Sequence, residues 1–374
     1  MLAGAEAELE ELRQQGLYRT LAPASGIDFT SNDYLGLSRH PALRAAVIEA
    51  LQSLPVGASA SRLLRGSADA HGELEQSAAE FFGTQKALFF GSGFAANFAL
   101  FSTLLARHDA VVFDEHIHAS VKEGIHASPA KRFRARHNDV QSFEDALRRA
   151  RASDARRLLM AVESVYSMDG DLAPLHELVQ LANAHDAVLV IDEAHATGIF
   201  GSRGRGAGEG LTPENTISVH TCGKSLGVSG ALVCGSQLVV DYLVNKARPF
   251  IYSTAPPPMI AAAVKRALEL VDEEPWRRKR VLDLARLAHG TLCRGAVFRG
   301  SQIIPVILGD AERALGAAAN LQRAGFDVRA VRPPTVPEGT SRLRISIHAD
   351  HRENDIAGLA EAVASWLQNS HGAV

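Results

Sequence analysis

Short apolar runs alternate with helical patterns through most of the 374-residue chain. In the segment 72–82, for example, Leu74, Ala78 and Phe81 recur at the spacing of one helix face. The apolar runs that predict strands lie at 87–90, 110–113, 158–162, 188–191, 217–220 and 231–234. Continuous apolar strands that alternate with helices are typical of a mostly parallel sheet covered on both faces. The pattern therefore predicts an α/β fold.

The pattern changes at the Ala-Pro-Pro-Pro segment 255–258. After it we expect one long helical region to about Arg294 and then a mixed region that ends in an amphipathic helix. The elements of that mixed region are strands at 303–308 and 342–347 and a helix at 311–324. The predicted organisation is a large α/β domain over 41–270, a small α+β domain over 271–374, and an N-terminal arm over 1–40 that packs with the small domain.

Composition narrows the class of protein. The chain has 39 Lys and Arg against 42 Asp and Glu, a formal charge of −3, which gives no electrostatic footprint for nucleic acid or a membrane surface. Three cysteines are too few for a disulfide framework or a zinc cluster. The acidic start does not look like a secretory signal, and no apolar stretch approaches the roughly 18 residues that span a bilayer. We expect a cytoplasmic protein with neither nucleic-acid nor membrane partners.

A glycine motif of the form G-x-G-x-x-A at 91–96 follows a predicted strand and opens a helix. The next strand ends in Asp114, so the segment also fits a dinucleotide-binding fold. Glycines at this place let helix N-terminal amides approach any phosphate, and a tight turn without a ligand has the same sequence. The motif predicts phosphate binding but does not identify the ligand that carries the phosphate.

Two further polar segments follow strands. The sequence Asp-Glu-Ala-His at 192–195 resembles the acidic box of some ATPases, but the Gly-Lys-Ser at 223–225 lies downstream of it, in the wrong order. Lys224 lies in an apolar, glycine-flanked segment, where desolvation would lower its pKa and expose a nucleophilic amine. Taken alone, the segment around Lys224 favours a surface lysine, and an Asp–His pair occurs easily by chance. Their positions at neighbouring strand ends favour a shared site.

A metal site is the third possibility, at the Asp-Glu-His-Ile-His segment 114–118. His116 and His118 would point to opposite faces of an extended chain, and no distant cluster of ligands matches them. We therefore predict no metal, and one histidine at the strand end that faces the cleft.

Together, these segments resemble the α-oxoamine synthase family, pyridoxal-phosphate enzymes of the aspartate-aminotransferase fold (fold type I). The similarity extends over more than 300 residues, from Ser31 to Arg344. The segments that carry it are 31–37, 92–97, 118–120, 163–170, 192–195, 221–224 and 342–344.

The resemblance implies pyridoxal 5'-phosphate as cofactor and assigns roles around its ring. Lys224 would hold the cofactor through its amine and then act as the base on the substrate Cα–H. Asp192 would pair with the pyridinium nitrogen and keep it protonated, which maintains the ring as an electron sink. His195 and Ser167 would contact the polar ring substituents, and His118 would stack over the ring.

The resemblance also places the cofactor phosphate. Gly93, Phe94 and Thr221 would receive it, and Ser253 or Thr254 would reach it from the other subunit of a homodimer with active sites at the interface.

For the substrates, the resemblance offers Arg344 for a carboxylate, with Asn32 and His118 beside the amino acid. Arg19 and Thr335 would meet the far end of the acyl chain. Arginine suits a carboxylate because its planar fork binds both oxygens.

Within the family, the segment Arg-Pro-Pro-Thr-Val-Pro at 332–337 is most similar to the branch that acts in biotin biosynthesis. This implies decarboxylative condensation of L-alanine with a pimeloyl thioester, carried by CoA or by a carrier protein. A sister activity that uses glycine with acetyl-CoA or succinyl-CoA stays open. A nicotinamide-dependent dehydrogenase, suggested by the glycine motif alone, would leave Asp192 and Lys224 without a role.

Overall fold

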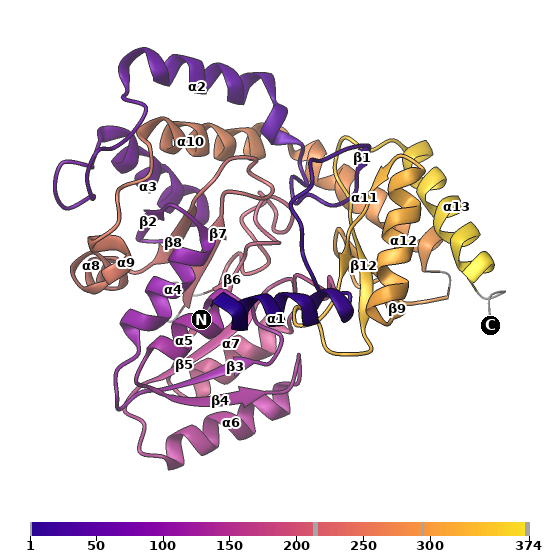
Figure 1. The fold of residues 1–374 in the computed structure, drawn as a ribbon. Helices are drawn as coiled ribbons and strands as arrows, with labels where there is room; N and C mark the ends of the chain where they lie inside the picture. The colour runs from indigo at the N-terminus through magenta and orange to yellow at the C-terminus, as the bar shows by residue number, and fades with distance from the viewer. Residues whose placement is uncertain (1, 212–215, 294, 371–374) are drawn as a thin grey trace. The chain divides into compact units, whose positions relative to one another are not determined.

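The computed structural model describes residues 2–211, 216–293 and 295–370 (Figure 1). Contacts within the chain divide it into two compact units. The larger unit comprises 33–167 and 171–279, and the smaller one comprises 1–32, 168–170 and 280–374. The domain boundaries after residues 40 and 270, expected from the sequence, remain predictions.

The larger unit is built on a seven-stranded sheet in the order β2-β8-β7-β6-β5-β3-β4. β8 runs antiparallel to both of its neighbours, and every other neighbouring pair in the sheet is parallel. The strands are β2 (Lys86–Phe90), β3 (Ala110–Asp114), β4 (Lys131–Ala135), β5 (Leu158–Glu163), β6 (Ala187–Asp192), β7 (Thr216–Thr221) and β8 (Ala231–Gly235). The predicted α/β class with a mostly parallel sheet is confirmed.

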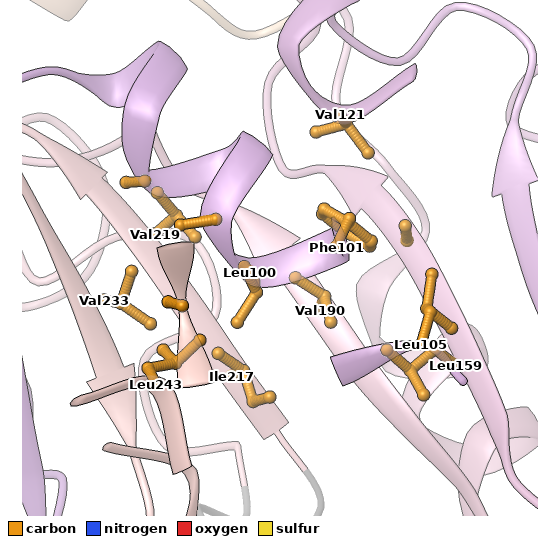
Figure 2. Close-up of a cluster of buried hydrophobic side chains, with 14 of the residues drawn as sticks. Leu100, Phe101, Leu105, Val121, Leu159, Val190, Ile217, Val219, Val233 and Leu243 are labelled. Atoms are coloured by element: carbon orange, nitrogen blue, oxygen red, sulfur yellow. The ribbon is translucent and has the colours of Figure 1, made fainter. Parts of the chain in front are cut away.

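Helices cover both faces of this sheet because its strands are apolar on both sides. Along β5, Leu159 and Ala161 join one core cluster, whereas Leu158, Met160 and Val162 join the other. This alternation follows from the two-residue period of a strand. Figure 2 shows the first cluster, in which side chains of β5, β6, β7 and β8 meet those of α4 (Gly93–Leu104), α5 (Ala119–Ala127) and α8 (Gln237–Lys246).

The second cluster lies under α6 (Val140–Ala152) and α7 (Leu175–Ala184). α10 (Pro258–Glu273) packs against α2 (Pro41–Ser53) and α3 (Asp69–Phe82). Two short elements, η1 (Leu37–Arg39) and α9 (Arg248–Ile251), also belong to the larger unit. Helix α11 (Pro275–Leu292) begins in the larger unit and ends in the smaller one.

The smaller unit has its own core. A three-stranded antiparallel sheet in the order β11-β12-β9 and a two-stranded parallel pair β1-β10 contribute to it. Its buried side chains include Phe29, Leu321 and Ile345. The elements are α1 (Leu2–Gln14), β1 (Ile27–Asp28), β9 (Ile303–Gly309), α12 (Ala311–Arg323), β10 (Phe326–Asp327), β11 (Ala330–Val331), β12 (Ser341–Ser346) and α13 (Glu353–Ser370).

Two elements differ from the sequence prediction. Strand β4 was not predicted, because three of its five residues are Lys or Arg; it is the edge strand of the sheet, where charged side chains remain in water. The long helical region predicted up to about Arg294 consists of two helices. It breaks into α10 and α11 at Glu274, because the proline that follows disfavours a helical conformation in the residue before it. None of the described helices is long and apolar enough to cross a bilayer.

Candidate active site

Polar side chains gather where β5, β6 and β7 end. Glu163 closes β5 and pairs in register with Asp192, which closes β6, and Asp192 is also the register partner of Val219 near the end of β7. Because these strands are parallel, their carboxyl ends lie along one edge of the sheet, where α/β folds bind their ligands. The segment 193–195 and the turn that carries Lys224 follow directly from this edge.

Asp192 is 5% exposed and its carboxylate is held at both oxygens. Asn97 Nδ2 donates to Oδ2 at 2.8 Å, and the backbone N–H of Ala194 donates to Oδ1 at 2.9 Å. Hydrogen bonds of this kind favour the ionised form of a carboxylate. The buried strand end therefore presents a fixed negative charge.

Lys224 and His195 are in direct contact. Lys224 Nζ lies 2.8 Å from His195 Nε2, and the other ring nitrogen, Nδ1, lies 2.7 Å from the hydroxyl of Tyr34. His195 is 4% exposed and Tyr34 is fully buried, whereas Lys224 is half-buried. The turn after β7 thus holds the lysine amine at the same strand edge as Asp192, rather than in bulk solvent.

The glycine motif heads α4 beside Thr221. The hydroxyl of Ser92 caps the helix by accepting from the backbone N–H of Ala95 at 3.1 Å. A Cβ at Gly93 would lie 2.5 Å from Thr221 Cγ2, so only glycine permits this approach of the helix N-terminus to the end of β7. Helix N-terminal amides beside a threonine hydroxyl form a suitable cradle for a phosphate.

His118 caps the N-terminus of α5 through its ring. Nδ1 accepts from the backbone N–H of Ser120 at 3.2 Å and lies 2.8 Å from the Ser120 hydroxyl. His118 as a whole residue is exposed, and desolvation of its ring by burial lowers the pKa of His118. Among charged neighbours, Asp192 opposes this lowering, and Lys224 and Lys122 reinforce it.

Glu163 is a further carboxyl group at this edge. It is 2% exposed, and one of its oxygens accepts from the backbone N–H of Ser167 at 3.2 Å. Burial, together with the nearby Asp192, raises the pKa of Glu163 to about 8. Ser167 is therefore positioned by the buried carboxyl group of Glu163.

Three of the predicted phosphate-site residues are exposed in the single chain. Phe94 is 51% exposed on the first turn of α4, and Ser253 and Thr254 lie in the exposed segment that follows α9. Their predicted roles stay predictions.

Of the predicted substrate residues, His118 belongs to the larger unit and the other four belong to the smaller one. Arg19 and Thr335 line one cavity of about 660 Å³, together with Arg332, whose guanidinium donates to the backbone carbonyl of Tyr18 at 2.8 Å. Burial, with the nearby Arg19, lowers the pKa of Arg332. The fold thus brings the two predicted acyl-end residues together, in a cavity of positive charge.

Arg344 and Asn32 do not line that cavity. Arg344 lies on β12, is 8% exposed, and donates to the hydroxyl of Ser346 at 2.9 Å. Asn32 is half-buried and is the last residue of the first segment of the smaller unit.

A second polar cluster in the larger unit surrounds His137. Its Nδ1 lies 2.9 Å from Asp114 Oδ1 and its Nε2 lies 2.8 Å from Asp171 Oδ2. Asn138 joins the same two carboxylates through its backbone N–H and its side-chain amide. Burial lowers the pKa of His137, but the hydrogen bonds to Asp114 and Asp171 outweigh it and raise the pKa to about 10.

We predict that His137→Gln lowers the free energy of unfolding by about 3 kcal/mol at pH 6, because it leaves buried carboxylates without their cation. The folded-state pKa lies above the ordinary value of 6.5, so the stabilisation is complete below about pH 6.5 and is lost as pH rises through 10. Urea unfolding at pH 6 and pH 10.5 measures the difference between wild type and variant. Exposed His126→Gln is the control and should be neutral at both values. An equal loss at both pH values for His137→Gln would contradict the charged ring.

Four residues of the site had no role predicted from the sequence. Tyr34, Asn97, Ser120 and Glu163 all lie within the segments that carried the family resemblance, but none has a chemical group that points to a role by itself. Their partners come from other strands and helices, so a sequence motif could mark their positions without indicating their contacts.

Comparisons with known proteins identify the family of this chain. The profile of the family Aminotransferase class I and II matches residues 24–363. The 8-amino-7-oxononanoate synthase of Anaeromyxobacter dehalogenans (strain 2CP-1) is 44% identical over 379 residues, which cover 96% of this chain and 94% of that protein.

Two solved structures are similar over almost the whole chain. A serine palmitoyltransferase from S. paucimobilis with a bound PLP–myriocin aldimine has a TM-score of 0.90 at 31% identity, covering 98% of this chain and 97% of that one. The 8-amino-7-oxononanoate synthase from Francisella tularensis has a TM-score of 0.79 at 29% identity, covering 93% and 99%. The family resemblance predicted from the sequence is confirmed. This chain belongs to the family Aminotransferase class I and II, and within it to the group formed by its 8-amino-7-oxononanoate synthase relatives.

Proposed function

We propose that this chain is a pyridoxal-phosphate enzyme that condenses L-alanine with a pimeloyl thioester, with loss of CO₂, to give 8-amino-7-oxononanoate. The contact that carries the proposal is that of Lys224 Nζ with His195, 2.8 Å apart at the strand edge that also holds Asp192. The 44% identical relative bears the name of this activity.

The residues at this edge fit the cofactor. It needs an amine for its aldehyde, an acid partner for its ring nitrogen and a cradle for its phosphate. Lys224 supplies the amine, and the doubly hydrogen-bonded Asp192 supplies the negative charge. The close approach of Gly93 to Thr221 leaves helix amides and a hydroxyl for the phosphate, with Phe94 as the next residue of that helix.

When bound, pyridoxal phosphate supplies a ring that accepts the electron pair released as bonds to the amino acid's Cα break. Asp192 would keep a proton on the ring nitrogen. His195 and Ser167 would hydrogen-bond the ring's phenolic oxygen, and His118 would cover the ring face. Lys224 then takes the proton from Cα and returns one after CO₂ has left.

The remaining roles are proposed from the chemistry of the residues. Arg344 receives the carboxylate of alanine, with Asn32 beside it. Arg19 and Thr335 bind the terminal carboxylate of the pimeloyl chain, which the positive charge of their cavity supports. A homodimer in which Ser253 or Thr254 completes the partner's phosphate site, and a cytoplasmic location, stay predictions.

Product identification tests the proposal. Purified enzyme loaded with pyridoxal phosphate is incubated with L-alanine and pimeloyl-CoA, or with the pimeloyl-carrier protein, and the product mass is measured. We expect 8-amino-7-oxononanoate and one CO₂ per turnover. Absence of product with both thioesters, from enzyme that has bound the cofactor, would refute this choice of substrates.

A second candidate is a sister condensation. The chain has a TM-score of 0.90 with a serine palmitoyltransferase, so the pair serine and palmitoyl-CoA is included among the substrates to be compared. Glycine with acetyl-CoA or succinyl-CoA remains the alternative from the sequence. The same assay with each amino acid and each thioester separates them. A kcat/KM that is higher for any of these pairs than for alanine with pimeloyl thioester would move the chain to that activity.

A further inference from the structure

A buried hydrogen-bonded chain joins the two polar groups that flank the proposed cofactor ring. It runs from Asp192 through Asn97 and Ser120 to His118. Asn97 Nδ2 lies 2.8 Å from Asp192 Oδ2 and 3.0 Å from Ser120 Oγ, and Ser120 Oγ lies 2.8 Å from His118 Nδ1. Asn97 is 2% exposed and Ser120 is fully buried, so the two linking side chains lie away from bulk solvent.

The amide of Asn97 can face this chain in only one way. A carboxylate accepts but does not donate, so the NH₂ group, and not the oxygen, must face Asp192. That NH₂ group has two hydrogens, and its two close acceptors are Asp192 Oδ2 and Ser120 Oγ. Both hydrogens are therefore used, and the Ser120 oxygen is an acceptor of one of them.

The direction of the remaining bonds follows. Since Ser120 Oγ accepts from Asn97, its own hydrogen is left for His118 Nδ1. The backbone N–H of Ser120 points to the same ring nitrogen, as the cap of α5 requires. Two donors converge on Nδ1, so this nitrogen carries a lone pair and not a proton. Within the described part of the chain, both hydrogen bonds of the ring are made by Nδ1.

We propose that Asn97 and Ser120 are positioning residues that hold His118 as the neutral tautomer with its proton on Nε2. The negative charge of Asp192 fixes the amide of Asn97, the amide fixes the hydroxyl of Ser120, and the hydroxyl fixes the ring. The ring thereby presents an N–H donor on its exposed side, and no second positive charge is added beside Lys224. The charged groups that act on this ring are Asp192, Lys224 and Lys122.

The tautomer follows from contacts of the chain itself, whereas its effect on turnover rests on the proposed function. Enzyme loaded with pyridoxal phosphate and labelled with ¹⁵N-histidine is studied by NMR at pH 7.5, with the His118 signals assigned by their loss in His118→Gln. We expect one protonated nitrogen, Nε2, and one unprotonated nitrogen, Nδ1. A proton on Nδ1 of the wild-type ring would overturn the proposal without the need for any variant.

Ser120→Ala removes the hydroxyl from this chain. We expect its His118 nitrogen signals to move toward the averaged values of exchanging tautomers. We also expect kcat with alanine to fall by about tenfold, the effect of one lost hydrogen bond, while KM changes less than twofold. Cofactor occupancy, measured by absorbance, should stay at the wild-type level.

The matched control is Ser128→Ala, which removes a buried hydroxyl from the other end of α5, where it donates to the carbonyl of Ile125. Ring signals and kcat should be unchanged there. Ring signals in Ser120→Ala that equal those of the wild type would remove Ser120 from the proposal. A wild-type enzyme that shows the expected tautomer but makes no 8-amino-7-oxononanoate would refute the proposed function alone.

Discussion

Replacing Lys224 with alanine is expected to abolish condensation, with a fall in kcat of at least about 10³-fold, because one amine both holds the cofactor and moves the substrate proton. The variant should lose the yellow colour of the bound cofactor on gel filtration. In the wild type, borohydride reduction followed by peptide mapping should place the cofactor on the peptide that contains Lys224. The structure supports this choice, since the amine contacts a buried histidine at the strand edge.

Lys246→Ala is the control for this prediction. Lys246 is an exposed lysine in the last turn of α8, and its removal should leave colour and turnover as in the wild type. Cofactor that is found on a different lysine after reduction would contradict the assignment of Lys224, and so would a Lys224→Ala enzyme that keeps both colour and activity.

The second large effect is expected for Asp192→Asn, which keeps the size of the side chain and removes its charge. Two unit charges about 4 Å apart interact by about 4 kcal/mol at an effective dielectric of 20, which corresponds to about 10³-fold in rate. We therefore expect kcat to fall by about 10³-fold, since the ring nitrogen would no longer keep its proton. The cofactor should still bind through Lys224, because that bond does not involve Asp192.

Steady-state kinetics and the absorbance spectrum of the bound cofactor measure this effect. Asp241→Asn, an exposed change on α8, is the matched control and should be silent. An Asp192→Asn enzyme that retains more than a tenth of the wild-type kcat would contradict a role for the charge. The circular dichroism spectrum of Asp192→Asn should match that of the wild type, so that the fall in kcat reports the lost charge and not unfolding.

The two predictions and the hydrogen-bonded chain describe one electrostatic arrangement. Asp192 is held by donors on both oxygens, and one of these donors, Asn97, leads on to His118. Loss of the charge in Asp192→Asn should therefore also disturb the tautomer of His118. The same ¹⁵N spectrum tests this coupling, and an unchanged ring would limit the influence of Asp192 to the cofactor itself.

Much of the fold followed from periodicity alone. Six of the seven strands of the large sheet were predicted, because a strand buried on both faces is a continuous apolar run with turn residues at its ends. Strand β4 was not predicted because a strand at the edge of a sheet can carry charged side chains and so lacks a continuous apolar run. The break within the helical region that ends at about Arg294 was not predicted, because periodicity does not register the effect of Pro275 on the residue before it.

For the candidate site, too, some features could be predicted from the sequence and others could not. The sequence by itself predicted the reacting groups, since an amine at Lys224 and a carboxylate at Asp192 follow neighbouring strands and match the family resemblance. It also determined the family, through segments spread over most of the chain.

Only the tertiary structure decided which groups touch. The contact of Tyr34 with His195 spans 161 positions in the sequence, and that of Asn97 with Asp192 spans 95. Hydrogen bonds depend on distances and directions set by strand order and helix packing, which no local pattern encodes. Asn97 and Ser120 are ordinary polar residues in the sequence, and they acquire a role only because the sheet brings Asp192 and the caps of α4 and α5 to one edge.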